Sequence, residues 1–329
     1  MIRVGLVGIG GISRVHLDAY RELPNVTLVA AADVQGEGAP RYEAATELGA
    51  RVYKSLGEML DNEQLDMLDV CTPTPIHADV VKEGLRRGLH VLSEKPMCRT
   101  SAEGEELVKL AEASGKLYMV AHVVRFMKPY AYLRSVIASG ELGRPVHISM
   151  KRLSSVPRWS FEDWMVGTEK SGGTPLDLSI HDLDFIYSIF GEPKDVSAVY
   201  RAFSATEGFG ANDYITSELI YDGFSVSVTG AQYDAKIPFT AEYLAIFENG
   251  WVELRSGKVY RSGEEINLDE EQEAKSTGIN VSSSGAYTDE IAYFADCIQM
   301  GEKPSFVAPE SSLGSVKLVE RLVAAAKRV

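Results

Sequence analysis

Two residues between Ser171 and Gly191 have the types and the spacing needed to move a proton. Asp177 and His181 lie four residues apart, so in a helix they share one face. An imidazole changes its charge near neutral pH, and a carboxylate one turn away can orient the ring and stabilise its charged form. The spacing therefore indicates a general base that is held in place by an acid.

The same residues have two other interpretations. Thr174 can cap a helix that runs to Gly191, and Asp177 can complete its capping box, which leaves His181 as a hydrogen-bonded core histidine. Asp177 and His181 can also share a zinc ion, although no cluster of further His or Cys ligands lies nearby. The predicted helix is apolar on two flanks, so we expect it to be mostly buried, with its polar face, continued by Asp184, toward a cavity. Taken alone, the stretch favours the capping interpretation.

Length and composition limit the classes of protein to which the chain can belong. At 329 residues it is long for one hydrophobic core, so we expect two domains. A net charge of −14 argues against binding to a nucleic-acid backbone, and no apolar run is long enough to cross a membrane. The first residues enter a strand directly, which leaves no room for a cleavable signal, and the three scattered cysteines suit a reducing compartment. We therefore expect a cytoplasmic protein.

The N-terminal residues have the pattern of a dinucleotide-binding turn. A strand from Ile2 to Val7 is followed by a Gly-rich turn, a helix through Glu22, and a second apolar strand from Val26 to Ala32 that ends at Asp33. The turn lets backbone N–H groups approach a pyrophosphate. Its predicted cofactor-binding residues are Gly8, Gly10, Gly11 and Ile12.

The acid at the end of the second strand predicts which dinucleotide binds. Asp33 is placed to accept hydrogen bonds from the ribose hydroxyls. Its charge would repel a 2′-phosphate, and no arginine adjoins it in the sequence, the nearest downstream being Arg41. We therefore expect NAD as the cofactor rather than NADP.

Strands and helices alternate up to about His122, which predicts a parallel sheet and a Rossmann dinucleotide-binding domain over residues 1–122. Ligands of such sheets bind at the carboxyl ends of the strands, and these ends share one edge. Two further loops fall at strand ends and are predicted to bind the cofactor. They contain Thr72, Pro73 and His77, and then Glu94 and Lys95.

The pattern changes after residue 122. Short strand-like runs separated by tight turns predict a large open sheet that is mainly antiparallel, in an α+β domain over residues 123–329. We expect surface loops at Glu264–Glu273 and Ser282–Gly285, and two closing helices at about Tyr287–Met300 and Glu310–Arg328. The whole chain is thus expected to be an α/β protein of two domains.

Several of these motifs, in this order, resemble the glucose–fructose oxidoreductase, inositol dehydrogenase and rhizopine-catabolism (Gfo/Idh/MocA) family. The resemblance covers essentially the whole chain and looks closest to the inositol dehydrogenase branch. It rests on the Gly-rich turn, Thr72-Pro73 with His77, Glu94-Lys95-Pro96, Arg125-Phe126, Gly172-Gly173 with Asp177 and His181, and Tyr287, Glu290 and Phe294 before Pro304.

The resemblance implies a catalytic set made of Lys95, Asp177 and His181. It implies an NAD-dependent dehydrogenase that oxidises a secondary hydroxyl of a cyclic polyol or sugar, with His181 as general base. It also implies a homodimer or homotetramer assembled through the C-terminal sheet. Beyond the catalytic set, the predicted substrate residues are Arg125, Trp159 and Trp164. The two tryptophans either offer an aromatic face to the C–H side of a ring or pack within their loop, and Arg125 either reaches the substrate or anchors the hinge between the domains.

Three alternatives to this function remain open at the level of the sequence. They are an NADP-dependent sugar dehydrogenase, an NAD-binding regulator without enzymatic activity, and a hydrolase or epimerase that uses tightly held NAD as a transient oxidant. None of them calls for a metal ion, a membrane or a nucleic-acid partner.

Overall fold

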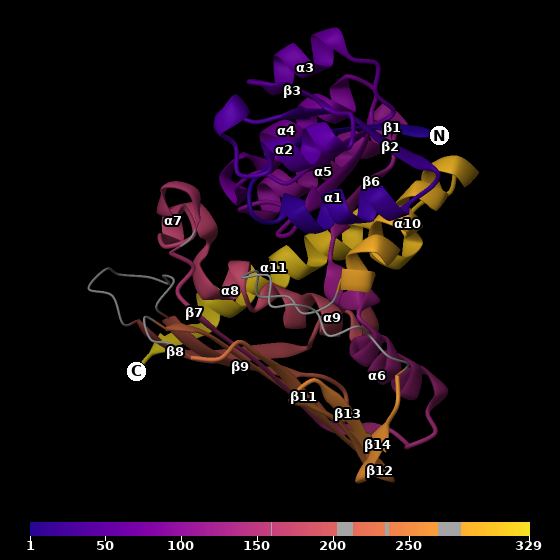
Figure 1. Cartoon of the computed structure of the whole chain (residues 1–329). Coiled ribbons are helices and arrows are strands. Elements are labelled where there is room, and N and C mark those ends of the chain that lie inside the picture. Colours follow the sequence, from indigo (N-terminus) through magenta and orange to yellow (C-terminus); the bar gives the residue numbers. More distant parts are fainter. Residues whose placement is uncertain (159, 203–212, 234–236, 269–283) are drawn as a thin grey trace. The chain divides into compact units, whose positions relative to one another are not determined.

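The computed structural model describes residues 1–158, 160–202, 213–233, 237–268 and 284–329. The chain divides into two compact units, of which the first contains Met1–Val123 and Ser276–Leu313 and the second Val124–Lys275 and Gly314–Val329. Figure 1 follows the chain through both units. The first unit thus includes a segment from the part of the chain that we assigned to the second domain. The division at residues 122 and 123 stays a prediction.

The first unit is built on a parallel sheet of six strands. Its strands are mostly continuous apolar runs with buried side chains, as expected for a sheet covered on both faces. The spatial order β3-β2-β1-β4-β5-β6 reverses direction between β1 and β4, and ligands bind at such a reversal. The strands are β1 (Ile2–Val7), β2 (Val26–Ala32), β3 (Arg51–Tyr53), β4 (Met67–Val70), β5 (His90–Glu94) and β6 (Tyr118–Ala121). The predicted Rossmann fold is confirmed.

Helices of the first unit follow the strands, as the alternation predicted. At α5 the hydroxyl of Thr100 accepts from the N–H of Glu103, whose carboxylate accepts in return from Thr100, so a capping box opens the helix. The helices are α1 (Ser13–Glu22), η1 (Gly36–Gly38), α2 (Tyr42–Glu47), α3 (Leu56–Asn62), η2 (Thr74–Ile76), α4 (His77–Arg86), α5 (Ser101–Ser114), α10 (Ser284–Met300) and η5 (Ser305–Val307).

The second unit contains a sheet of nine strands in the order β14-β13-β12-β11-β7-β10-β9-β8-β15. Its pairs are antiparallel except β7 with β10 and β8 with β15, which are parallel. The mainly antiparallel sheet is therefore confirmed. The strands are β7 (Pro145–Ser155), β8 (Asp195–Ala202), β9 (Asp213–Ile220), β10 (Ser225–Tyr233), β11 (Thr240–Phe247), β12 (Gly250–Arg255), β13 (Lys258–Arg261), β14 (Glu264–Ile266) and β15 (Ala326–Arg328).

Several expectations for residues 123–329 were wrong. The surface loop expected at Ser282–Gly285 overlaps helix α10, which begins at Ser284. The segment predicted as an acidic surface loop begins with strand β14, because Glu264–Ile266 pairs with β13. The last predicted helix ends at Ala325, and the next three residues pair with β8 as strand β15. For both strands, pairing overrides a local pattern that is polar or helical; β14 pairs with its neighbour β13 in a hairpin, and β15 pairs with a strand far along the chain.

Helices of the second unit lie along one face of the sheet, and Figure 1 shows α8 and α9 on that face. The described helices are η3 (Val123–Phe126), α6 (Lys128–Ser139), η4 (Phe161–Asp163), α7 (Thr168–Ser171), α8 (Gly173–Asp177), α9 (Ile180–Phe190) and α11 (Pro309–Ala325), of which η3 and α11 have residues in both units. Within the described part of the chain, no helix is long and apolar enough to cross a membrane.

Two fully buried ion pairs fix α9 within the second unit. Arg152 on β7 donates to both carboxylate oxygens of Asp182, at 3.0 and 2.7 Å, and Tyr130 shares the same guanidinium. Arg125 makes the same two-pronged contact with Asp184, at 2.8 and 2.6 Å. A buried charge is tolerated only when it is paired and hydrogen-bonded, so each acid sets the position of α9 against a specific neighbour.

Removal of one partner from such a pair is expected to destabilise the protein. We predict that Asp182→Ala lowers the free energy of unfolding by about 3–5 kcal/mol, because Arg152 stays buried without a counter-charge. Denaturant unfolding measures the change. Arg144→Ala, which breaks the exposed pair with Glu248, is the matched control and should change stability little. Equal effects of the two substitutions would contradict the prediction.

Candidate functional site

The Gly-rich turn after β1 brings the backbone close to β4 on one side and leaves it open on the other. Gly8 has φ of +86°, and a Cβ built there would lie 2.7 Å from the carbonyl oxygen of Cys71. A Cβ at Gly10 would meet no atom within 4 Å. The hydroxyl of Ser13, the first residue of α1, donates to the carbonyl of Gly10 at 2.8 Å. The turn therefore presents accessible backbone at the N-terminus of α1, the arrangement that suits a phosphate group.

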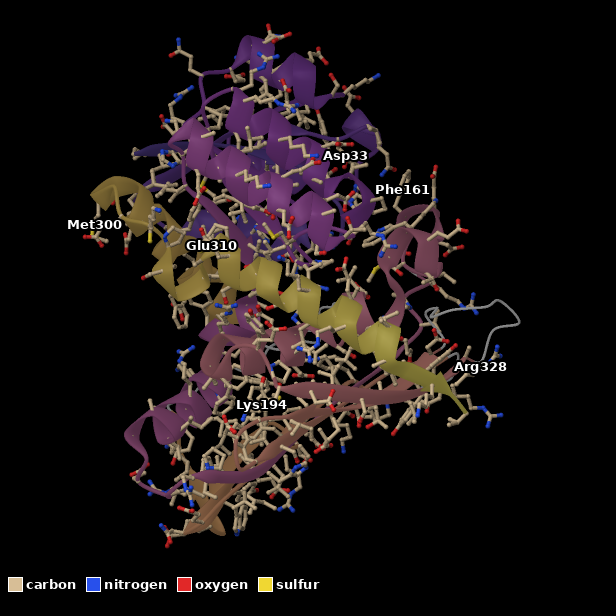
Figure 2. All side chains as sticks on the ribbon, turned by 180° about the vertical axis from the view of Figure 1, so that it is seen from behind. Asp33, Phe161, Lys194, Met300, Glu310 and Arg328 are labelled. Carbon is tan, nitrogen blue, oxygen red and sulfur yellow. The ribbon has the colours of Figure 1, made fainter. Side chains whose placement is uncertain are left out.

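Asp33 is held beside this turn at the end of β2, where Figure 2 labels it. Its two carboxylate oxygens accept from the backbone N–H groups of Ile9, at 3.0 Å, and of Gln35, at 2.9 Å. Within the described ranges, no cation lies at ion-pair distance from it. Each oxygen keeps a further lone pair, so the carboxylate is oriented and able to accept from ribose hydroxyls.

The loop after β4 is joined to the loop after β5 by a histidine. The buried ring of His77 lies 2.8 Å from the carbonyl oxygens of both Thr72 and Pro96. Burial lowers the pKa of His77, and its two carbonyl partners oppose that shift. The structure therefore places His77 as a link between the two loops. Its contact with the cofactor stays a prediction, as do those of Pro73 and Ile12.

The side chain of Thr72 also bears on ligand binding. Its hydroxyl oxygen is buried and has no hydrogen-bond partner among the residues that the structure describes. Buried hydroxyls are nearly always satisfied. Thr72 follows the central strand β4 at the reversal of strand order, next to the Gly-rich turn. An unsatisfied hydroxyl at this position, with the open space at Gly10, fits a dinucleotide.

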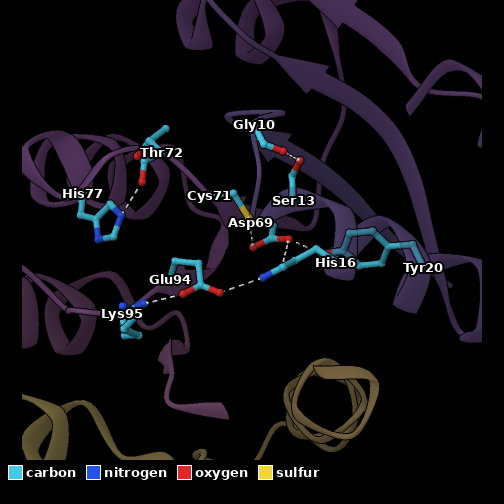
Figure 3. A network of polar contacts seen from close by, with 10 residues as sticks. All are labelled: Gly10, Ser13, His16, Tyr20, Asp69, Cys71, Thr72, His77, Glu94 and Lys95. Atoms are coloured by element: carbon cyan, nitrogen blue, oxygen red, sulfur yellow. Dashed lines mark hydrogen bonds and ion pairs between the residues drawn. The ribbon is translucent and has the colours of Figure 1, made fainter. Parts of the chain in front are cut away.

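A buried histidine that the sequence analysis did not single out links the neighbouring strands β4 and β5 (Figure 3). The ring of His16, on α1, lies 2.8 Å from Asp69 on β4 and 3.1 Å from Glu94 on β5. The hydroxyl of Tyr20 donates to Asp69 at 2.6 Å. Burial disfavours the charged ring, but the charge and hydrogen bond of Asp69 outweigh it, so the pKa of His16 lies well above its ordinary value. The ring is therefore an imidazolium between two carboxylates.

This cluster also has the spacing of a metal site, but two of its possible ligands, the thiol and the imidazole, carry protons. The ligand atoms of His16, Asp69 and Cys71 lie within 4.8 Å of one another. A thiol must lose its proton to bind a metal well, and burial raises the pKa of Cys71 to about 12, with Asp69 adding to the shift. The pKa of His16 is also raised, so both groups would have to release a proton before they could hold a metal ion.

Glu94 and Lys95 end β5 at the same edge. One carboxylate oxygen of Glu94 faces His16, and the other accepts from the backbone N–H of Lys95 at 3.0 Å. The structure shows Glu94 paired with His16, and its predicted contact with the cofactor stays a prediction. The backbone that carries Lys95 is thereby fixed at the carboxyl end of the sheet.

In the second unit, Asp177 and His181 are both buried, with 4% and 5% of their surface exposed. They do not belong to one continuous helix, because α8 ends at Asp177 and α9 begins at Ile180. The predicted single helix from Thr174 was therefore wrong. The hydroxyl of Thr174 does not cap it but lies 3.3 Å from the carbonyl of Asp213 and from the side-chain oxygen of Gln232.

A glutamine that the sequence analysis missed holds the candidate acid. The side-chain N–H of Gln232 on β10 donates to Asp177 at 3.1 Å, and Gln232 is itself almost fully buried. A glutamine on the otherwise apolar inward face of β10 was the available signal, since a buried amide needs partners. Burial also raises the pKa of nearby Asp213 to about 7.

The structure bears differently on each of the remaining predicted substrate residues. Arg125 is buried and paired with Asp184, which also accepts from Ser315 at 2.8 Å. Asp184 is thus not part of an open polar face with His181, and a substrate contact of Arg125 gains no support. Trp164 is half-buried after η4, and its substrate contact stays a prediction. Trp159 lies outside the described residues.

Comparisons with known proteins agree with this geometry. Residues 2–122 match the family model described as oxidoreductase family, NAD-binding Rossmann fold (GFO_IDH_MocA), and residues 130–253 match the GFO/IDH/MocA C-terminal domain. The trans-1,2-dihydrobenzene-1,2-diol dehydrogenase of Sus scrofa is 32% identical over 69% of this chain and 68% of that enzyme. The myo-inositol 2-dehydrogenase of Thermotoga maritima is 26% identical over 58% of this chain and 55% of that enzyme.

The share of each relative that aligns with this chain is smaller in the sequence comparisons than in the comparisons of structures. The chain spans only 58 to 60% of the length of several other curated relatives that it matches. Among solved structures, the WlbA dehydrogenase from Bordetella pertussis in complex with NADH and UDP-GlcNAcA has a TM-score of 0.83 at 21% identity, covering 98% of this chain and 96% of that one. This likeness shows a shared fold.

The charge on His16 predicts a specific dependence of stability on pH. Its folded pKa exceeds the unfolded value, so its contribution is full below about pH 6.5 and is lost as the pH rises through the folded pKa. We predict that His16→Gln lowers the free energy of unfolding by about 3–5 kcal/mol at pH 6.5. The deficit should shrink at higher pH, by at most about 1.4 kcal/mol per unit.

Denaturant unfolding of the wild type and the variant at several pH values between 6.5 and 9 measures this difference. His147→Gln, which alters a half-exposed histidine bonded to two serines, is the control and should show no such trend. A deficit of His16→Gln that stays constant or grows over this range would show that the ring is not charged in the folded protein.

Proposed function

Because the chain belongs to the GFO/IDH/MocA oxidoreductase family, we propose that it is an NAD-dependent dehydrogenase that oxidises a secondary hydroxyl of a cyclic polyol or sugar. One observation carries the proposal. The edge of a parallel sheet brings together open backbone at Gly10, an oriented carboxylate at Asp33, an unsatisfied hydroxyl at Thr72 and the fixed backbone of Lys95. Such an edge suits a dinucleotide and a cationic side chain beside it.

The proposed substrate class rests on the compounds for which two relatives are named. The pig relative is named for a cyclic diol and the Thermotoga relative for myo-inositol, so both names specify a ring that carries neighbouring hydroxyl groups. Because the chain spans only part of many relatives, their substrates support the class and not an individual compound. The proposed substrate is therefore a ring alcohol, inositol-like or a pyranose.

Asp33 supports NAD as the preferred cofactor. Its carboxylate lies where ribose hydroxyls are bound in this fold, and it would repel the 2′-phosphate of NADP. Both of its oxygens are already oriented by backbone N–H groups, so the carboxylate is in place before any ligand arrives. This pre-orientation reduces the entropy that binding would cost.

Oxidation of an alcohol requires the loss of a hydride from carbon and of a proton from oxygen, and bound NAD would accept the hydride. In the proposed mechanism, His181 takes the proton, a step that typically contributes about 10²–10⁴-fold to the rate. Asp177 orients the imidazole and stabilises its charged form, while Gln232 holds that carboxylate in place. Lys95 donates to the reacting oxygen and stabilises its developing negative charge.

The first prediction concerns turnover. We expect NADH absorbance to appear when the protein is incubated with NAD and a panel of inositols, cyclic diols and pyranoses, and to be absent with acyclic secondary alcohols. NAD binding is measured separately by fluorescence. A protein that binds NAD but oxidises no member of the panel would exclude this substrate class, and product formation without net NADH would indicate an NAD-cycling hydrolase or epimerase.

The second prediction concerns the general base. We predict that His181→Ala lowers kcat by about 10²-fold or more and changes KM by a smaller factor, because it removes proton transfer in the transition state. NAD affinity should be unchanged. His147→Ala, on the sheet of the same unit, is the control variant and should keep kcat. An unchanged kcat in His181→Ala would remove this residue from catalysis.

A further inference from the structure

Lys95 lies between two residues that buried histidines hold in place. The side chain of Glu94, the residue before it, lies 3.1 Å from the ring of His16. The carbonyl oxygen of Pro96, the residue after it, lies 2.8 Å from the ring of His77. The two histidines belong to α1 and α4, so both neighbours of the lysine are fixed by elements outside β5.

The carboxylate of Glu94 connects His16 to the backbone of Lys95, as Figure 3 shows. One of its oxygens faces the imidazole, and the other accepts from the N–H of Lys95 at 3.0 Å. The side chain of Glu94 thereby fixes the peptide group at which Lys95 begins. Glu94 is 5% exposed, and a buried carboxylate keeps its place only while its charge is paired. Without His16, the orientation of that peptide group would lose its support.

The imidazole of His16 is itself locked in place. Its Nδ1 lies 2.8 Å from Asp69, which also accepts from the hydroxyl of Tyr20 at 2.6 Å. The ring centroid of Tyr287, on α10, lies 6.2 Å from that of His16, and His16 has no exposed surface. A side chain that packing and hydrogen bonds lock in this way can hold a functional group within the narrow limits that catalysis requires.

We propose that His16 is a positioning residue for Lys95, which acts through Glu94 to hold the backbone of the lysine in its catalytic orientation. This inference rests on the proposed function, in which Lys95 donates to the reacting oxygen, and extends it to a residue on another element. A catalytic group that is misplaced by about 1 Å can lose about 10²-fold in rate. The affinities for substrate and cofactor draw on many other contacts, so the loss of His16 should lower kcat.

Two substitutions separate this role from a purely structural one. Because of the lengths of the two side chains, the amide nitrogen of asparagine falls near the Nδ1 position of a histidine, and that of glutamine near the Nε2 position. His16→Asn therefore keeps a donor toward Asp69 and loses the one toward Glu94, whereas His16→Gln does the reverse. Both variants lose the charge of the ring and one hydrogen bond, so each is the structural control for the other.

Steady-state kinetics with NAD and the ring alcohol that the wild type oxidises tests the inference, once thermal unfolding has shown that both variants are folded. We expect His16→Asn to lower kcat by about 10- to 100-fold, with KM and the affinity for NADH changed by less than about 3-fold. His16→Gln should keep kcat within about 3-fold of the wild type, because its amide still reaches Glu94. Equal losses of kcat in the two variants, or a loss confined to KM, would overturn the inference.

Hydrogen exchange of the Lys95 amide, followed by NMR, tests the same contact without a substrate. The reference is the amide of Val91 in the same strand, which donates to the carbonyl of Leu117. Relative to this reference, His16→Asn should speed exchange at Lys95 by about 10-fold or more, and His16→Gln should not. Equal exchange in the two variants would overturn the inference. If the wild type oxidises no ring alcohol, the proposed function fails, while the exchange rates still decide whether His16 holds the backbone of Lys95.

Glu94→Gln applies the test with His16 in place, should the histidine variants not fold. Its side chain offers one acceptor oxygen to two donors, so the contact with either His16 or Lys95 is lost. The substitution should lower kcat and speed the exchange of the Lys95 amide, as His16→Asn does. Unchanged exchange at Lys95 in this variant would overturn the inference.

Discussion

The imidazolium of His16, held between two buried carboxylates, is the interaction on which the candidate cofactor edge depends. Asp69 and Glu94 come from neighbouring strands, and two acids without a cation between them would be costly to bury in this core. Because His16 belongs to the helix that follows the Gly-rich turn, the same ring ties that turn to the end of β5. The backbone of the Gly-rich turn and the backbone of Lys95 are thus positioned by one buried charge.

Much of the first unit could be predicted because its signals are local. The Gly-rich turn, the apolar strands and Asp33 lie within the first part of the chain, and each has a physical reason to be where it is. His16 could not be identified in the same way, since its partners are 53 and 78 residues away. The sequence did contain one sign, an aspartate within the buried strand Met67–Val70, because such an acid requires a partner.

The second unit shows where periodicity fails. Its strands were predictable from the alternation of apolar and polar residues, but the helix through Asp177 and His181 was predicted as continuous and is broken at Leu178 and Ser179. A helical pattern shows which residues share a face only if the helix is unbroken. Here Thr174 uses its hydroxyl to bond the sheet instead of capping the helix. Tertiary contacts therefore decide the local structure, and those contacts come from strands that lie far along the chain.

The position of Asp177 therefore depends on strand β10 as much as on the helix. Gly230 and Gln232 are two residues apart and point to the same inward face of the sheet. A Cβ at Gly230 would collide with the hydroxyl of Ser179, so glycine lets the break between α8 and α9 approach the sheet without moving that side chain. That close approach brings Asp177 within hydrogen-bond reach of Gln232. A larger residue at 230 would displace the break, and with it the carboxylate, without touching either member of the proposed acid–base pair.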